Sequence, residues 1–487
     1  NVFDFGDTGR GAADRNKQQA PKLNTAYEVI YKLAAKYQDA EAQGIANWLH
    51  RELKTTTWEK AWAFYAHDPG VRPLPMRSVP TSYYFRNAET AFWRSSWEHG
   101  ATAFAFRCGP PEGHHVAELA PLMSDWRQST GHAHPDANSF IIYSHGEYLT
   151  GDTGYTGVKL TEDHNTILVD GRGQENDGRH EVFKEVPNAR LDKLRVAEYW
   201  STPGYFYARG EAASAYFSDL GVSRFDRHFL YVAPAYFVVW DELATTEPRN
   251  FSWLLNADNN FVTKGPADFG ITNRNATLFV QRLLPASVKH QIVPQMVTTQ
   301  GRPGEVEKGK LEQRGFQLVE TTNVKNREIQ FLHFLRPADN EWKRHPRVYA
   351  LPGNGRGLRI EWPNGDKETV LLREESDDVK IRGDRAVVRI SKQGVLQRLV
   401  LQRGIRVEHK GVELLRSSQP ISIAVSIIDG KEWRGALTAE SVTTIVLRAP
   451  VEPKLLVNGA SIKSAYDANK KTITFEVGAG TNVIEAN

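Results

Sequence analysis

The sequence has 487 residues, of which 40% are hydrophobic and 24% are charged, a composition that excludes an intrinsically disordered chain. No run of about 18 uncharged apolar residues occurs, which excludes a membrane-spanning helix. The 61 Lys and Arg exceed the 58 Asp and Glu by only three, without a dense basic run, which argues against a dedicated nucleic-acid binder. The length suits two or three domains, and the single cysteine, Cys108, excludes an internal disulfide. Because the chain starts at Asn1 without a methionine or a signal-peptide pattern, we expect a piece of a longer precursor.

Residues 24 to 66 carry apolar side chains at three- and four-residue spacing, a pattern that predicts helices. A third short helix is expected from Trp58 to Tyr65, because Asp68-Pro69-Gly70 stops helices. Several prolines follow before residue 81, so this stretch is interpreted as a linker. The apolar positions of the first two helices are Tyr27, Ile30, Tyr31, Ala34, Ile45, Trp48, Leu49 and Leu53.

From about Tyr83 to the C-terminus, short alternating runs broken by Gly, Pro, Asn and Asp predict strands. The runs are Ala101–Arg107, Ser139–Tyr143, Thr166–Val169, Tyr231–Trp240, Leu358–Trp362, Val387–Ile390, Ile421–Ile428 and Thr472–Val477. Three dipeptides in this region are typical of hairpin turns: Asn364-Gly365, Asp429-Gly430 and Asn458-Gly459. Roughly 400 residues of antiparallel structure are too many for one small sandwich. We therefore expect a large β-sandwich followed by a smaller one, with a boundary near residue 380.

The densest group of reactive side chains lies in Gly131-His132-Ala133-His134-Pro135-Asp136. In an extended chain, alternate side chains share a face, which would direct His132, His134 and Asp136 to one side. Two imidazoles on one face suit a metal ion or proton transfer. The alternative is a pair of surface or hydrogen-bonded histidines, and Pro135 disfavours a regular strand here.

Two later residues extend this group. Asp152 follows a strand-like run, and His164 opens another run. If neighbouring antiparallel strands bring His134, Asp152 and His164 together, two nitrogens and one oxygen form a set that suits Zn²⁺. The alternatives are a turn aspartate before Gly154 and a histidine bonded to the backbone at a strand start.

Three stretches carry a family resemblance. They are Ser129 to Phe140, Tyr148 to Tyr155 and His164 to Gly171, and with them the chain resembles the heparinase II/III-like polysaccharide lyases over roughly Tyr83 to Asp258, including Arg227 to Asp241. It looks most like their oligoalginate-lyase-like branches. The resemblance implies an α+β multidomain fold. Its parts would be the remainder of an (α/α) toroid in residues 1–80, a large antiparallel β-sandwich in 81–380 and a smaller C-terminal β-domain in 381–487.

The resemblance also implies roles for particular residues. His132 matches the family's catalytic histidine. His134, Asp152 and His164 match the residues that hold a bound divalent metal, zinc in family members that have it. Tyr155 matches a position that lines the substrate cleft, the alternative being an ordinary aromatic on a turn. The family's toroid also supplies a tyrosine well over a hundred residues before the histidine, and we expect this tyrosine upstream of Asn1, on an N-terminal piece of the same precursor.

The function expected from the resemblance is cleavage of a uronic-acid-containing polysaccharide or oligosaccharide by β-elimination, with alginate favoured and glycosaminoglycans such as heparin or heparan sulfate as the alternative. His132 would act as the base or as a donor to the substrate carboxylate. Two competing hypotheses are a glycoside hydrolase using Asp136 and Asp152, and a non-catalytic carbohydrate-binding β-protein with a structural metal. A polymeric substrate implies a secreted or periplasmic protein.

A polar stretch follows the segment His164 to Gly171. It contains Arg172, Arg179, His180 and Lys184, which are suited to contact an anionic chain. A solvated loop is the more common state of such a run, and we favour that interpretation from the sequence.

Overall fold

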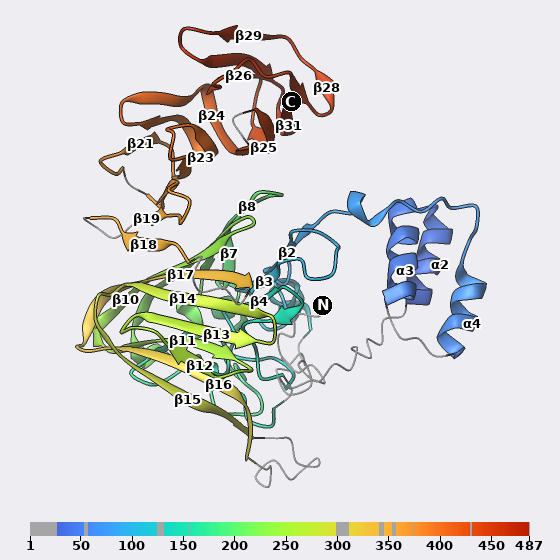
Figure 1. Cartoon of the computed structure of the whole chain (residues 1–487). Helices are drawn as coiled ribbons and strands as arrows, with labels where there is room; N and C mark the ends of the chain where they lie inside the picture. Colours follow the sequence, from blue (N-terminus) through green and yellow to red (C-terminus); the bar gives the residue numbers. More distant parts are fainter. Residues whose placement is uncertain are drawn as a thin grey trace.

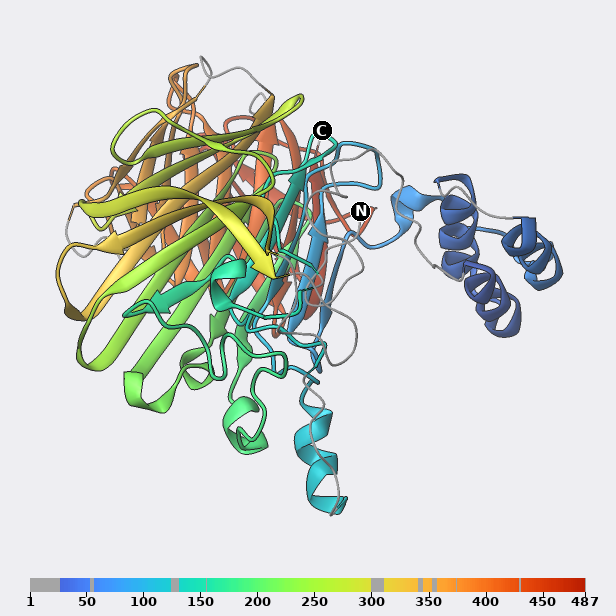
Figure 2. The same cartoon turned by 90° about the horizontal axis from the view of Figure 1, so that it is seen from below.

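The computed structural model describes residues 27–52, 57–123, 131–154, 156–298, 311–339, 345–352, 357–373, 375–428 and 431–486. Antiparallel sheets make up most of these residues, and the helices of the N-terminal region stand to one side of them (Figure 1). The view from below shows the sheets stacked on one another, with the same helices standing apart (Figure 2). The predicted order of helices followed by strands is confirmed.

The N-terminal region contains α2 (Tyr27–Tyr37), α3 (Ala40–Glu52) and α4 (Thr57–Ala66). They enclose a small core of Tyr27, Tyr31, Ala46 and Ala63. The apolar spacing marks the packed side of α2, whereas the buried residues of α3 are Gln43, Gly44 and Ala46 and its predicted apolar positions are only partly buried. The toroid implied by the family resemblance is not shown by these three helices and remains an expectation. Among the described residues, none of the helices combines the length and apolar character needed to cross a bilayer.

Among the described residues, short helical pieces lie in the connections between the longer elements. They are α5 (His115–Leu119), α6 (Asn188–Leu191) and five 3-10 turns: η1 (Met76–Ser78), η2 (Ala120–Leu122), η3 (Thr161–Asp163), η4 (Ala213–Ala215) and η5 (Ser218–Leu220). Of these, η3 matters for the site described below, because it ends directly before His164.

The central sandwich has two layers. One layer is an eight-stranded sheet in the order β12 (Phe261–Thr263), β13 (Asp268–Asn273), β14 (Ala276–Leu284), β17 (Asn326–Asp339), β10 (Tyr236–Arg249), β9 (Val222–Val232), β8 (Tyr205–Glu211), β7 (Arg195–Thr202). The other layer contains two sheets. The first is β1 (Ser82–Phe85), β2 (Thr90–Arg94), β3 (Ala103–Arg107), β4 (Ser139–Ser144), β5 (Glu147–Tyr148), and the second is β15 (Val288–Thr298), β16 (Leu311–Thr322), β11 (Phe251–Ala257), β6 (Ile167–Val169).

Alternate side chains along the strands point inward and fill the space between these layers. On β3, Phe104 lies opposite Trp93 of β2 and Ile142 of β4, and all three side chains are buried in the sandwich core. The rings of Phe104 and Trp93 stack with centroids 5.4 Å apart. Full burial of one such side chain contributes about 1.5–3 kcal/mol.

A further sheet packs on the outer face of the eight-stranded sheet. Its interface core joins Tyr207, Trp240 and Phe334 to Leu358 and Val387 of the C-terminal half. Its main path runs through β18 (Arg347–Ala350), β19 (Gly357–Glu361), β20 (Lys367–Leu371), β22 (Arg385–Ile390), β23 (Leu396–His409), β24 (Val412–Ile428), β25 (Glu432–Ala439), β31 (Gly480–Ala486), β27 (Leu455–Val457) and β28 (Ala460–Ser461). The remaining strands are β21 (Val379–Arg382), β26 (Thr443–Arg448), β29 (Ser464–Asp467) and β30 (Thr472–Val477). The chain passes from the eight-stranded sheet to this further sheet between Asp339, the end of β17, and Arg347, the start of β18. The expected domain division near residue 380 remains a prediction.

Most turn signals fall where they were expected. Asn458 and Gly459 both have positive φ between β27 and β28, and Gly365 has φ +89° between β19 and β20. Asp429-Gly430 lies outside the described residues. The predicted strand Tyr231–Trp240 is wrong as one strand: a turn at 233–235 separates β9 from β10, because proline at 234 cannot donate to a sheet ladder.

Candidate active site and metal-binding group

Three buried polar side chains meet at the junction of the two smaller sheets. His134 precedes β4, Asp152 follows β5, and His164 lies between η3 and β6. Among the described residues, these three form a group that could hold a metal ion, because one potential ligand atom from each lies within 4.8 Å of the others. The predicted clustering of these three residues is therefore present in the fold.

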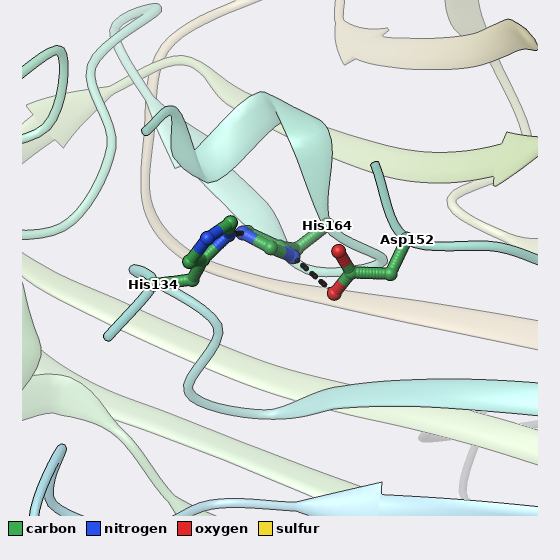
Figure 3. A group of neighbouring side chains, drawn as sticks. All are labelled: His134, Asp152 and His164. Carbon is green, nitrogen blue, oxygen red and sulfur yellow. Dashed lines mark hydrogen bonds and ion pairs between the residues drawn. The ribbon is translucent and has the colours of Figure 1, made fainter. Parts of the chain in front are cut away.

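The ring of His164 lies between the other two side chains (Figure 3). Its Nδ1 is 2.8 Å from Oδ2 of Asp152, and its Nε2 is 3.3 Å from Nδ1 of His134. The backbone amide of Gly154 donates to the other carboxylate oxygen of Asp152 at 3.0 Å. The arrangement is thus a chain of carboxylate, imidazole and imidazole.

Electrostatics tie Asp152 to His164. Burial favours the neutral form of Asp152, but His164, His134 and the amide of Gly154 together outweigh it and lower the pKa of the carboxyl group. Burial likewise opposes charge on His164, yet Asp152 raises the pKa of this imidazole to about 9. Neighbouring Asp163 behaves differently, because burial raises its pKa to about 8.

The residues fit a zinc ion. Two imidazole nitrogens and a carboxylate are zinc ligands, and tetrahedral Zn–N bonds of about 2.0–2.1 Å place two ligand nitrogens roughly 3.4 Å apart. The distance of 3.3 Å between His134 and His164 agrees with that value. Since Asp152 contacts the far nitrogen of His164, it is also placed to orient this imidazole, as carboxylates do beside metal-bound histidines.

His132 lies differently from its two neighbours. It is exposed, whereas His134 and Asp136 are buried, and residues 131–132 form a turn before β4. The carboxylate of Asp136 instead pairs with Arg107 at 3.1 Å. The extended geometry that would direct all three side chains to one face is therefore wrong, and solvent reaches only His132 of the three. Tyr155, the predicted cleft residue, lies outside the described residues.

Asn165 fixes the backbone around the group. Its side-chain amide donates to the carbonyls of Phe140 at 2.7 Å and Gly151 at 3.2 Å, and its carbonyl oxygen accepts from the amide of Asn256 at 2.7 Å. The residue after His164 thus connects the start of β4, the segment before Asp152 and strand β11. Reasoning from the residues assigned no role to Asn165, which stood directly after a candidate ligand and within the stretch His164 to Gly171 that carried the family resemblance.

Arg227 of β9 supports the same backbone from inside the sandwich. Its Nη1 donates to the carbonyl of Asn138 at 2.6 Å and to the carbonyl of Asn165, and its other nitrogens pair with Asp241 of β10. Reasoning from the residues alone assigned no role to this arginine, which stood only within the stretch that carried the family resemblance. Its support of the backbone depends on contacts with the carbonyls of Asn138 and Asn165, which are more than 60 residues away in the sequence. No local sequence pattern encodes such contacts.

Comparisons with known proteins agree with this architecture. The family model described as "Heparinase II/III-like, C-terminal" matches residues 72–332. The crystal structure of the heparan sulfate lyase of Pedobacter heparinus is similar with a TM-score of 0.51 and 18% identity, over 76% of this chain and 50% of that one. A crystal structure of heparinase III has a TM-score of 0.48 and 12% identity, over 76% and 50%. The chain therefore spans about half the length of these proteins. The curated proteins gave no match.

Proposed function

The chain belongs to the heparinase II/III-like family, and we propose that it is a polysaccharide lyase acting on a uronic-acid-containing chain. The observation that supports this most directly is the exposed His132, two residues before the buried group of His134, Asp152 and His164. One imidazole is available to a substrate, and the residues that follow it are held in place.

The proposed reaction is a β-elimination. A base removes the proton on C5 of the uronate, next to the carboxyl group, and the oxygen on C4 leaves with the bonding electrons. The products are a 4,5-unsaturated uronate end and a new hydroxyl end. Because the C5 proton is weakly acidic, a donor must stabilise the negative charge that builds on the carboxylate.

His132 is the residue of this chain that we propose for the reacting position. It either accepts the C5 proton or donates to the carboxylate, and an imidazole can do both. The acid that protonates the leaving oxygen is proposed to be a tyrosine of the upstream piece. A zinc ion held by His134 and His164, with Asp152 as a third ligand or as the orienting group, would supply a rigid cross-link beneath this segment.

The substrate is proposed to be an acidic polysaccharide, with alginate and glycosaminoglycan as competing hypotheses. The alginate hypothesis comes from the resemblance of the three sequence stretches. The heparan sulfate lyase that shares the fold supports the glycosaminoglycan hypothesis at least equally. With a polymer as the substrate, we also propose that the protein works outside the cytoplasm.

Ultraviolet absorbance of the new double bond, conjugated to the carboxylate, tests the proposal. The protein is incubated with alginate, heparan sulfate, hyaluronan and ulvan, and reducing ends are counted in parallel. We expect absorbance and reducing ends to rise together on one of these polymers. Reducing ends without absorbance would mean hydrolysis, and binding with neither signal would mean a carbohydrate-binding protein; both outcomes contradict the proposal.

A further inference from the structure

The polar loop after β6 is built into the site. The side chain of Gln174 exchanges two hydrogen bonds with the backbone of Ala137, accepting from its amide at 3.2 Å and donating to its carbonyl at 3.1 Å. The carboxylate of Asp177 accepts from the amide of Thr161 at 2.8 Å, and the Thr161 hydroxyl accepts from the amide of Gln174 at 2.8 Å. The charged side chains of Arg172, Arg179 and Lys184 are exposed, as expected of a solvated run, but the segment that carries them is anchored beside both candidate histidine ligands.

A buried lysine joins this loop to the residue before His132. The side chain of Lys159 is fully buried, and its ammonium donates to the carbonyls of Gly131 and, at 3.1 Å, of His180. The backbone of Lys159 also pairs with Arg179. Burying an ammonium group is costly unless hydrogen bonds replace its water. These two carbonyls supply such bonds, so the backbones at 131 and 180 are held within reach of one amine.

The ring of His180 lies along Gly131. A β-carbon added to Gly131 would lie 3.5 Å from Nε2 of His180 and 4.0 Å from its Cδ2. The Nδ1 atom is buried without a hydrogen-bond partner, and the residue as a whole is partly exposed. Nε2, on the side of Gly131, is therefore the ring nitrogen left to contact a ligand.

Two other basic side chains of the loop form ion pairs with carboxylates. Arg172 pairs with Asp219 at 2.5 Å, and Lys184 pairs with Glu181 at 2.5 Å. Among the described residues, His180 has no such carboxylate partner, and it is the loop residue whose ring lies against the residue preceding His132.

We propose that His180 is a substrate-binding residue of the same site as His132, and that its Nε2 donates a hydrogen bond to the carboxylate of a bound uronate. This inference rests on the proposed function and deepens it. Lys159 holds the two backbones in the register that the contact requires. Neither the composition of the loop nor the family resemblance singled out His180.

Steady-state kinetics of two variants test the contact. Because His180 is partly exposed, His180→Ala should fold normally, with an unchanged Tm. Loss of one hydrogen bond to a charged group should raise KM about tenfold or more, with a change in kcat of less than about threefold. Gly131→Ala places a methyl group in ordinary contact with Nε2, and it should raise KM similarly without lowering Tm. His115→Ala, an exposed histidine on α5, is the matched control and should leave KM unchanged.

A binding measurement separates this inference from the proposed function. Calorimetry compares His132→Ala with the His132→Ala, His180→Ala double variant, using alginate and heparan sulfate tetrasaccharides and their carboxyl-reduced forms. We expect the His180 substitution to weaken binding of the acidic probes and to have no effect on the reduced ones. If His180→Ala leaves KM and acidic-probe affinity unchanged in an active enzyme, the inference fails while the lyase proposal stands. If no polymer is cleaved but acidic probes bind through His180, the lyase proposal fails and the contact stands.

Discussion

Arg227 and Asp241 form a bidentate ion pair that is fully buried, with Nε to Oδ1 at 2.6 Å and Nη2 to Oδ2 at 2.9 Å. The pair spans neighbouring strands β9 and β10, where the two residues lie directly opposite each other. The remaining guanidinium nitrogen, Nη1, donates to the carbonyls of Asn138 and Asn165. One buried arginine thus connects the sandwich core to the backbone beside His134 and His164.

Arg227→Met should destabilise the fold and the site together. The substitution leaves Asp241 buried without its partner and two carbonyls without a donor, which costs about 3–5 kcal/mol. Thermal unfolding should show a large fall in Tm, and metal content should fall with it. Arg327→Met removes an exposed pair with Glu247 and should change neither quantity. Equal Tm values for the two variants would contradict the role assigned to Arg227.

His132→Ala should remove activity without affecting stability. Loss of a general acid or base lowers a rate by about 10²- to 10⁴-fold. Because the side chain is exposed, its removal leaves no cavity, so Tm and metal content should stay at the parent values. The initial rate of absorbance increase and a thermal melt on the same preparation provide the check. A variant with parental activity would show that another group reacts with the substrate.

His164→Ala should lose both metal and stability. It leaves the carboxylate of Asp152 buried without its imidazole partner, at a cost of about 3–5 kcal/mol. Elemental analysis of the purified protein and Tm with and without a chelator measure the two effects. Chelation should lower the Tm of the parent protein and leave that of His164→Ala unchanged.

Asp152→Asn separates two roles of the carboxylate. If Asp152 mainly orients His164, the amide should retain metal with an affinity lowered about 10- to 100-fold. If Asp152 is a direct ligand, the variant should lose the metal as completely as His164→Ala. A metal titration of the chelator-treated variants distinguishes these results, and parental affinity in Asp152→Asn would exclude both roles.

Glu198 of β7 should make the contact between the eight-stranded sheet and the sheet on its outer face sensitive to acid. Its carboxylate lies 3.0 Å from Arg385 of β22 and 2.7 Å from Arg403 of β23. Burial alone would raise the pKa of Glu198, but Arg385 and the neighbouring arginines lower it to about 2. Since the folded-state pKa lies below the ordinary value of 4.5, the carboxylate stabilises the fold above that pH and loses this effect as pH falls towards 2.

Glu198→Gln tests this dependence. The variant should have a lower Tm than the parent at neutral pH, and the difference should shrink as pH falls from about 4.5 towards 2. Melting curves of both proteins across this range give the comparison. Parallel curves would mean that the titration of Glu198 contributes nothing to the pH dependence of stability.

The sequence by itself determined the elements and the set of candidate ligands. Three-to-four spacing marked α2 to α4, alternation marked strands such as β3 and β30, and the residue types at 134, 152 and 164 indicated a candidate metal-binding group whose members the fold brings together. These features are local, since helix and strand periods and ligand chemistry are carried by short segments.

Only the tertiary structure decided which of these side chains face solvent and what supports them. His132 is exposed while His134 is buried, and the predicted strand Tyr231–Trp240 is divided by a turn. Arg227 reaches carbonyls 62 and 89 residues away, and Lys159 bridges residues 131 and 180. Burial and hydrogen-bond partners depend on which segments the packed sheets bring together, and contacts between distant segments leave no periodic trace in the chain.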